Sequence, residues 1–313
     1  MSSWVVPDDL AGHRTDLVLA RLAGLSRSRA RRAIEEGRVR VDGRPARVRA
    51  PVPAGAVVEA ELGEEEPPAS PDPSVPFVER YVDDAVIVVD KPPGVVVHPG
   101  AGVRGSTLVD GLLARHPELG DLGAERRHGL VHRIDRDTSG LLLVARTPAA
   151  FDRLQDALRR RAIGRRYLAL VHGVVSSATG TIEAPIGADP RNPTRRAVRA
   201  DGKAAVSHYR RLATWDRPPR TLLEVRLETG RTHQIRVHLD AIGHPIVGDR
   251  TYGRGGPGDP GRTFLHAAVL VFSHPATGEE ITVAAPLPDD LRSALASLGL
   301  PDRGSVPDLE PSE

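Results

Sequence analysis

The sequence contains no cysteine, so the chain can form no disulfide and cannot use a thiolate as a nucleophile or metal ligand. Lysine is nearly missing as well, since Lys91 and Lys203 are the only two among 43 basic residues. No apolar run reaches the roughly 18 residues that a transmembrane helix needs. The segment Met1–Trp4 lacks the basic start and apolar stretch of a signal peptide. These absences predict a cytoplasmic protein that does not enter a membrane.

Apolar residues are plentiful, at 40% of 313, which is enough to fold one large domain and a small one. The formal net charge is only +2, but arginine is concentrated near the N-terminus. Between His13 and Ala50, eleven arginines stand against four acidic residues. Such a basic segment is typical of a protein that binds a polyanion. The alternative is that it only reflects the preference of the whole chain for arginine over lysine.

The N-terminal unit, residues 14–62, is predicted to hold two helices followed by a small sheet. Apolar residues at helical spacing indicate the helices, and alternating valines with glycine between them indicate the strands. The clearest predicted elements are a helix over 16–23, a helix over 27–36 with Ser26 as its N-cap, a strand over 39–41 and a tight turn at Asp42–Gly43.

Residues 63–75 are acidic, rich in proline and poor in apolar residues, which predicts a flexible, solvated linker. A second unit follows over 76–300, and the polar tail 301–313 is expected to be disordered. Strand patterns in the second unit outnumber helix patterns and do not alternate regularly with them. This favours an α+β fold with a mixed, largely antiparallel sheet over a doubly wound fold. The predicted elements are strands over 86–89 and 140–146, helices over 107–115 (capped by Ser106) and 149–161, and strand or helix candidates over 167–171, 222–227, 233–239 and 263–271.

The segment His132–Leu143 places charged residues directly in front of an apolar strand. Asp135 lies in it between Arg133 and Arg136, and these cations would keep its carboxylate ionised. An ionised carboxylate at the mouth of a sheet can act as a nucleophile or as a base. The alternative is a salt-bridged turn that only starts the strand, and the residues by themselves leave both open.

Four segments of the second unit occur in a fixed order: residues 90–99, the H-R-I-D-R-D-T-S-G-L segment around Asp135, residues 166–173, and residues 228–238 followed by 243–249. They resemble the motifs of the RluA-type pseudouridine synthases, and together span most of residues 76–275. The resemblance implies the pseudouridine synthase fold and the isomerisation of uridine to pseudouridine in structured RNA. It is closest to the RluD-like branch, which implies large-subunit ribosomal RNA as substrate.

The N-terminal unit separately resembles an S4 RNA-binding domain. The resemblance rests on Arg14-Thr15-Asp16, on residues 25–30 and on residues 37–43, with Thr15 in place of leucine and Asp42 in place of asparagine. It implies a helix–helix–sheet unit that contacts RNA phosphates. The residues expected to make these contacts are Arg27, Arg29, Arg31 and Arg38.

The same resemblance implies a role for each residue of the second unit's site. Asp135 is expected to be the essential catalytic carboxylate, Tyr167 to pack on the flipped uracil, and Arg236 to pair with Asp135. Arg133 is expected to reach into the RNA when the target base leaves its stack. Without the resemblance, Tyr167 would be taken as a core aromatic, Arg236 as a structural ion pair and Arg133 as a phosphate contact. The implied enzyme needs no cofactor and no metal, and we expect it to act as a monomer.

Other functions find weaker support in the sequence. Residues 100–105 fit G-x-G-x-x-G, but without a regular βαβ alternation after them they do not predict dinucleotide binding. The histidines lack a metal-ligand spacing. Asp135 and Asp137 would point to opposite sides of an extended segment, which does not suit a glycosidase. The main rival is a non-catalytic RNA-binding or ribosome-assembly factor, which would explain the basic segment but not the catalytic motifs.

Overall fold

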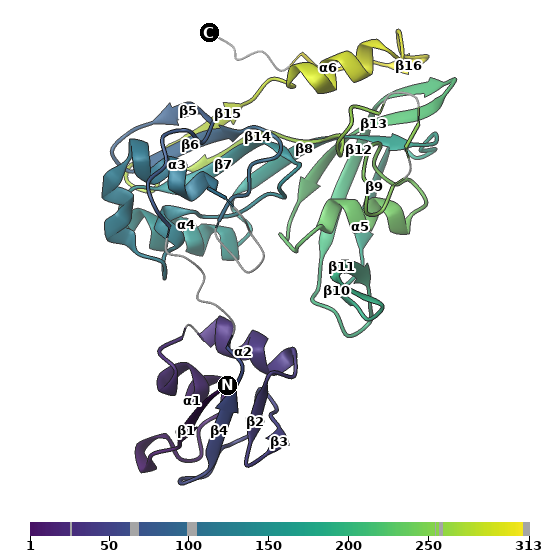
Figure 1. The fold of residues 1–313 in the computed structure, drawn as a ribbon. Helices are drawn as coiled ribbons and strands as arrows, with labels where there is room; N and C mark the ends of the chain where they lie inside the picture. Colours follow the sequence, from purple (N-terminus) through teal and green to yellow (C-terminus); the bar gives the residue numbers. More distant parts are fainter. Residues whose placement is uncertain (26, 63–68, 99–104, 254, 257–258, 309–313) are drawn as a thin grey trace. The chain divides into compact units, whose positions relative to one another are not determined.

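The computed structural model describes residues 1–313 except 26, 63–68, 99–104, 254, 257–258 and 309–313. The chain divides into two compact units, Met1–Pro67 and Pro68–Glu313, which are described separately (Figure 1). Both combine helices with antiparallel strands, so the predicted α+β class is confirmed.

The first unit packs two helices on a four-stranded antiparallel sheet in the order β1-β4-β2-β3. Both predicted helices are present within one residue of their expected ends, and the expected N-cap Ser26 lies outside the described residues. The unit starts earlier than residue 14, because Ser2–Val5 pairs with the last strand. Its elements are β1 Ser2–Val5, a 3-10 turn Asp8–Leu10, α1 Thr15–Leu22, α2 Arg27–Glu35, β2 Val39–Val41, β3 Arg44–Pro45 and β4 Val57–Ala60.

The core of the first unit lies between α1, α2 and the sheet, where Leu19, Ile34 and Val58 are buried. The turn between β2 and β3 is formed by Asp42 and Gly43, both with positive φ, as a tight hairpin requires. Asp42 also accepts a hydrogen bond from the backbone N–H of Val57 (2.8 Å). A short carboxylate therefore serves in the turn position where the S4 pattern has asparagine.

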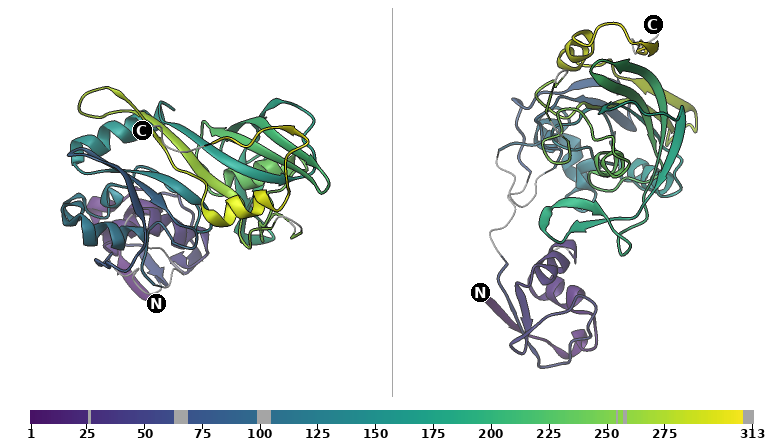
Figure 2. Two further views of the ribbon diagram at one scale, coloured as in Figure 1. Left: turned by 90° about the horizontal axis from the view of Figure 1, so that it is seen from above. Right: turned by 90° about the vertical axis from the view of Figure 1, so that its right-hand side faces the viewer.

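The second unit is built on one large sheet in the order β16-β12-β13-β8-β14-β7-β6-β5, with β15 beside β14 and β9 beside β12. Its neighbouring strands are antiparallel except for the pair β7 and β14. The sheet is strongly twisted (Figure 2). Its strands are β5 Val78–Val82, β6 Val86–Lys91, β7 Ser139–Ala145, β8 Gly164–His172, β9 Thr179–Glu183, β12 Val206–Asp216, β13 Pro219–Leu227, β14 Leu265–Ser273, β15 Glu280–Ala284 and β16 Arg303–Gly304, and β10 Ile186–Asp189 pairs separately with β11 Asn192–Val198.

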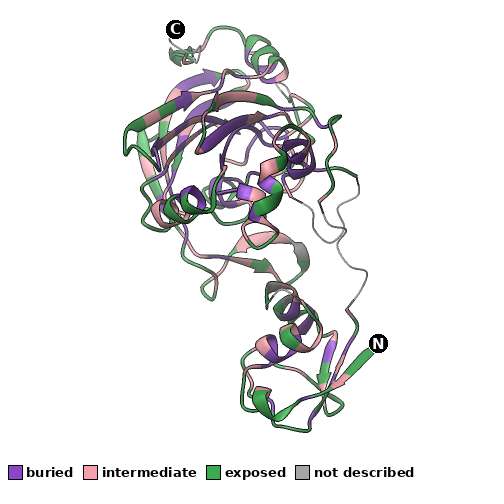
Figure 3. Cartoon of the chain, turned by 90° about the vertical axis from the view of Figure 1, so that its left-hand side faces the viewer, coloured by how far each residue is buried: buried purple, intermediate pink, exposed green. Residues whose placement is uncertain are grey.

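Helices cover both faces of this sheet. One face buries leucines of α3 and α5 in the larger core, and the other buries Phe151 and Leu154 of α4 in a second core. Burial is therefore concentrated along the strands and the inner sides of the helices (Figure 3). The helices are α3 Leu108–Arg115, α4 Pro148–Arg159, α5 Gln234–Ala241 and α6 Asp289–Ala296, with 3-10 turns at Pro117–Leu122 and Arg127–Gly129.

Two helix predictions are refined by the structure. The N-cap of α3 is Thr107 rather than the expected Ser106, because Thr107 and Asp110 form a reciprocal capping box. The candidate segment 233–239 is a helix, α5, and begins after His233 in a left-handed conformation. The candidates over 167–171, 222–227 and 263–271 are strands.

Parts of the expected linker and of the expected disordered tail are ordered in the structure. Residues 63–68 and 309–313 lie outside the described residues. The rest of the expected linker is tied to the second unit, since the backbone N–H groups of Ser70 and Asp72 donate to Asp110 and Val75 is buried. The start of the expected tail is also ordered, because β16 pairs with β12. Backbone hydrogen bonds to a folded neighbour, which composition does not reveal, fix both segments.

Candidate active site

Asp135 lies in the loop that leads into β7, and other parts of the chain hold the backbone of this loop. The carbonyl of Arg136 accepts hydrogen bonds from Lys91 Nζ and from the N–H of Gly94, both at 2.9 Å. Arg262 donates to the carbonyl of Asp137 (3.0 Å) on the other side of the turn. The loop is therefore fixed at its backbone, while the side chain of Asp135 remains 22% exposed.

Gly140, directly after this loop, is required where β7 meets β14. Its φ is +108°, and a Cβ there would lie 2.3 Å from the carbonyl oxygen of Ala267. Only glycine fits so close a backbone approach. The glycine of the motif around Asp135 thus sets the parallel pairing that carries the loop to the edge of the sheet.

Lys91 is fully buried beneath the loop. Its ammonium donates to the backbone carbonyls of Pro92 and Arg136, at 2.7 and 2.9 Å. Burial, together with the smaller effect of the nearby charge of Arg262, lowers the pKa of Lys91 to about 7, although the charges of Asp137 and Asp135 oppose the shift. The structure thus gives the lysine of the segment 90–99 a positioning contact with the loop.

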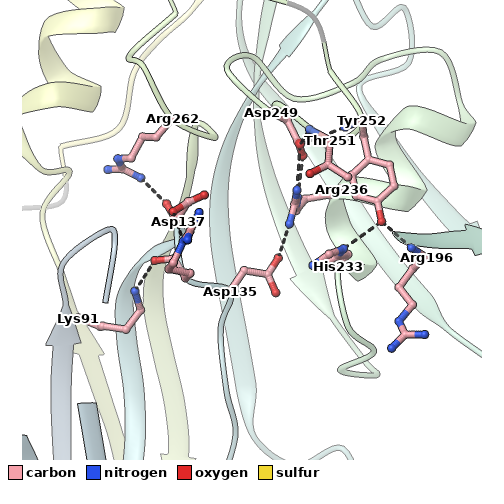
Figure 4. A network of polar contacts seen from close by, with 11 residues as sticks. Lys91, Asp135, Asp137, Arg196, His233, Arg236, Asp249, Thr251, Tyr252 and Arg262 are labelled. Atoms are coloured by element: carbon pink, nitrogen blue, oxygen red, sulfur yellow. Dashed lines mark hydrogen bonds and ion pairs between the residues drawn. The ribbon is translucent and has the colours of Figure 1, made fainter. Parts of the chain in front are cut away.

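Arg236, on α5, lies between two carboxylates (Figure 4). Its Nη1 donates to Asp135 (3.1 Å), and its Nε and Nη2 form a two-pronged pair with Asp249 at 2.6 and 2.9 Å. Asp249 is completely buried and also accepts from the N–H groups of Thr251 and Tyr252. Asp249 therefore orients the guanidinium that reaches Asp135.

Arg236 and its carboxylate partners stabilise one another's charged forms. Burial by itself would lower the pKa of Arg236, but the hydrogen bonds and charges of Asp249 and Asp135 raise it above its ordinary value. Burial by itself would raise the pKa of Asp249, but Arg236 and the two N–H donors hold it below its usual range. Arg236 and Asp249 thus remain charged at neutral pH, and Asp135 faces a permanent cation.

Tyr167, on β8, and Asp135 line one pocket of about 80 Å³ together with Arg236 and Arg133. Tyr167 is buried, and burial raises the pKa of its hydroxyl, so it remains protonated at neutral pH. Arg133 is exposed and lines both this pocket and a neighbouring one of about 280 Å³ that also reaches Asp135. The four residues that the sequence assigned to the site, far apart in the chain, are brought together.

A larger cavity of about 530 Å³ lies between β5, Lys91 and α6. Phe77, Leu287 and Arg292 are among its lining residues, but Asp135, Tyr167 and Arg236 are not. The smaller pocket is therefore the one that joins a carboxylate, an arginine and an aromatic ring.

The four arginines assigned to RNA contacts in the first unit lie on or next to α2, and each has a partner within the unit. Arg27 pairs with the buried Asp16 (3.1 Å), Arg31 pairs with Glu35 (2.8 Å), and Arg38 pairs with Glu36. Arg29 donates to the carbonyl of Leu62 at 3.4 Å. Arg27 and Arg31 still expose about half of their side chains, at 53% and 49%.

Three residues that the structure places at the site have no role predicted from the sequence: Lys91, Asp249 and Arg165. Lys91 and Asp249 stand inside the matched motifs, so the signal was present without a contact to interpret it. Arg165 precedes Tyr167 by two residues, which puts both side chains on one face of β8, and this spacing could have identified it.

The remaining sequence features concern nucleotide binding, metal binding and membrane insertion. Residues 99–104, which include most of the G-x-G-x-x-G match, lie outside the described residues. Within the described residues, no group of three or more His, Asp or Glu side chains could hold a metal ion. Among these residues there is also no helix with the length and apolarity to cross a membrane.

Comparison with known proteins gives two family matches. The family described as RNA pseudouridylate synthase matches residues 85–241, and the S4 domain matches residues 14–58. The first match includes Asp135, Tyr167 and Arg236, and the second includes the four arginines of the first unit.

Individual relatives extend the similarity over nearly the whole chain. "Ribosomal large subunit pseudouridine synthase D" of Xanthomonas campestris is 44% identical over 308 residues, covering 94% of this chain and 91% of the relative. An "Uncharacterized RNA pseudouridine synthase" of Chloroflexus aurantiacus is 46% identical over 300 residues, covering 94% and 92%. Among solved structures, human RNA pseudouridylate synthase domain containing 1 is similar with a TM-score of 0.55 and 27% identity, over 70% of this chain and 88% of that one.

Proposed function

This chain belongs to the RNA pseudouridylate synthase family, and from that premise we propose that its substrate is a uridine in large-subunit ribosomal RNA. Family membership makes it an isomerase and supports the enzyme over a non-catalytic RNA-binding factor. The proposed substrate is supported by relatives named ribosomal large subunit pseudouridine synthase D, at 40–44% identity over most of the chain. The S4 domain, a match found next to the catalytic one, supports binding to structured RNA.

The observation that carries the proposed site is the contact between Asp135 and Arg236 (3.1 Å) at the mouth of the pocket that Tyr167 also lines. Pseudouridine formation breaks the bond between ribose C1′ and uracil N1, turns the base and joins it again through C5. A carboxylate serves this reaction by attacking C1′ or by removing the proton at C2′. Held ionised by Arg236, Asp135 suits either step, and both remain open.

Tyr167 and Arg133 are proposed to handle the base. The buried ring of Tyr167 forms the pocket wall on which a flipped uracil would stack, and its protonated hydroxyl lies beside the reaction. The exposed guanidinium of Arg133 at the pocket mouth is placed to enter the RNA as the base leaves. Flipping costs a few kcal/mol, least where pairing is weak, so loop uridines are the expected targets.

The first unit is proposed to bind RNA phosphates through the exposed faces of Arg27, Arg29, Arg31 and Arg38. We place the enzyme in the cytoplasm, where ribosomal RNA is assembled, in keeping with a chain without cysteine. We also propose that it acts as a monomer, since one chain supplies the whole pocket.

Release of tritium from uridine C5 in a ribosomal RNA transcript tests the proposed site. Asp135→Asn removes the carboxylate but keeps its size, and we expect the rate to fall by more than about 10³-fold. Asp137→Asn is the matched control, because Asp137 is two residues away in the same loop, 45% exposed and paired with Arg136.

The control variant should keep a rate near that of the wild type, and both variants should bind the transcript as the wild type does. Comparable losses in the two variants would show that the loop, and not the carboxylate of Asp135, is responsible. Failure of the wild type to release tritium from any ribosomal RNA, with release from another RNA, would overturn the proposed substrate.

A further inference from the structure

Arg165 is a buried cation in the pocket of Asp135. It lies on β8 two residues before Tyr167, and both side chains line the pocket. Arg165 is only 5% exposed, whereas Arg133 and Arg231, which also line the pocket, are exposed. The pocket wall therefore includes a guanidinium that is as buried as the side chain of Tyr167.

The contacts of Arg165 leave most of its donors unused. Its Nη2 donates to the carbonyl of Glu228 at the long distance of 3.5 Å, and its buried Nε has no hydrogen-bond partner. Within the described residues, no carboxylate lies within ion-pair distance of it. Arg236, in the same pocket, pairs with two carboxylates. One of the two buried arginines is thus neutralised by the protein and the other is not.

The described residues around Arg165 leave room for its guanidinium and supply no negative charge to it. A Cβ on Gly230 would lie 2.9 Å from Nη1, so a side chain there would displace the guanidinium. Burial, with a smaller contribution from the charge of Arg165, lowers the pKa of the neighbouring His132 to about 3, so this imidazole is neutral. Burial also lowers the pKa of Arg165 itself. Leaving a buried cation without a counter-ion is unfavourable, which indicates that a ligand supplies the negative charge.

We propose that Arg165 is a catalytic residue that binds the uracil base and stabilises the negative charge the base acquires when its glycosidic bond breaks. When the C1′–N1 bond breaks, its electron pair stays on the base and spreads over N1, O2 and O4. The planar fork of arginine donates two parallel hydrogen bonds to such an anion. The charge is consumed when C5 bonds to C1′, C5 loses its proton and N1 gains one, so Arg165 stays protonated throughout.

This inference rests on the proposed function of the pocket, but it is independent of how Asp135 acts. Whether the carboxylate attacks C1′ or removes the C2′ proton, the base departs with the electron pair. A fixed cation in a site that excludes water stabilises such a charge far better than water does.

The test compares single-turnover conversion of uridine in a ribosomal RNA transcript by the wild type, Arg165→Met and Arg166→Met. Arg166 is the matched control, because it is the next residue on β8, points to the other face and lies 3.9 Å from Glu224. We expect Arg165→Met to lose about 10²-fold in rate, as for removal of one oxyanion donor, with unchanged RNA affinity. Arg166→Met should keep the wild-type rate.

A second substrate separates charge stabilisation from a structural role. In a transcript with 5-fluorouridine, fluorine withdraws electrons and makes the base a better leaving group. Arg165→Met should therefore lose about tenfold less on this substrate than on uridine, measured as loss of the nucleoside by chromatography. An equal loss on both substrates would overturn the proposal, as would a wild-type rate on uridine.

Arg165→Lys keeps the charge but not the fork, and it serves if Arg165→Met does not fold. We expect it to lose about tenfold on uridine and less on 5-fluorouridine; a wild-type rate, or an equal loss on both, would again overturn the proposal. A wild type that converts no uridine would instead contradict the proposed function, so the two failures are distinguishable.

Discussion

The two units of this chain use arginine in opposite ways. In the first unit, Arg27 and Arg31 expose about half of their side chains and pair with acidic neighbours close in the sequence or the fold. In the second unit, Arg236 and Arg165 are at most 9% exposed and line a pocket. One unit presents charge to solvent, and the other encloses it.

This difference separates two physical functions of the same side chain. Exposed cations attract a polyanion over a distance, and salt screens that attraction. Enclosed cations act over one hydrogen bond, and salt screens them little. The first unit should therefore govern RNA affinity and its salt dependence, while the pocket should govern the rate and the stability of the second unit.

The largest effect is expected at Asp249, which is fully buried against Arg236. Asp249→Asn leaves the guanidinium paired with Asp135 alone, and breaking a buried pair costs about 3 kcal/mol or more. We expect this loss in the free energy of unfolding in urea, together with a slower single-turnover rate. Glu224→Gln, which breaks the more exposed pair with Arg210, should cost less than about 1 kcal/mol. Similar losses in both variants would contradict the expectation that a buried ion pair matters more for stability than an exposed one.

Deletion of residues 1–62 should come next. Losing several phosphate contacts should weaken binding to ribosomal RNA by about 10²-fold at low salt and flatten the dependence of affinity on salt. The truncated chain should retain the folded second unit, because the two units have separate cores. Filter binding at several salt concentrations measures the effect, and circular dichroism checks the fold. An unfolded product would contradict the independence of the second unit.

The burial of His132 should make the protein less stable in acid. Burial lowers its pKa in the folded state to about 3, against about 6.5 in the unfolded chain. Below pH 6.5 the unfolded chain therefore binds a proton at this histidine that the folded chain does not bind. The free energy of unfolding consequently falls as the pH falls. Between pH 6.5 and 5 this amounts to about 2 kcal/mol.

His132→Gln keeps an acceptor for the N–H of Leu143 but cannot be protonated. The free energy of unfolding of the variant should therefore fall less steeply over the same pH range, by about that amount. Parallel pH curves for the two proteins would mean that His132 is not buried as the structure has it.

The smallest effect is expected at Arg31, which is exposed and paired with Glu35 one turn later on α2. Arg31→Gln should weaken RNA binding by less than about tenfold and reduce the salt slope by about one, with an unchanged catalytic rate. Arg159→Gln, on the exposed side of α4, is the control. Equal effects at Arg31 and Arg159 would show that the first unit has no special part in binding.

Local patterns predicted much of the fold. The helices of the first unit and the strands β6 and β7 follow from apolar spacing, which depends on neighbours within a few residues. The site was also predicted in outline, because Asp135, Tyr167 and Arg236 stand in motifs. The ordering of residues 69–75 and the pairing of β16 were missed, because a polar segment becomes ordered when distant backbone groups accept its hydrogen bonds.

The sequence by itself determined the class of fold, the family motifs and the residues expected at the site. Only the tertiary structure decided how their charges are arranged, because Asp135 and Arg236 are 101 residues apart and meet through one hydrogen bond. It also decided that Asp249 neutralises one buried arginine, Arg236, while Arg165, which lines the same pocket, has no carboxylate partner among the described residues. Burial and pairing are properties of the packed chain, and they give identical side chains different functions.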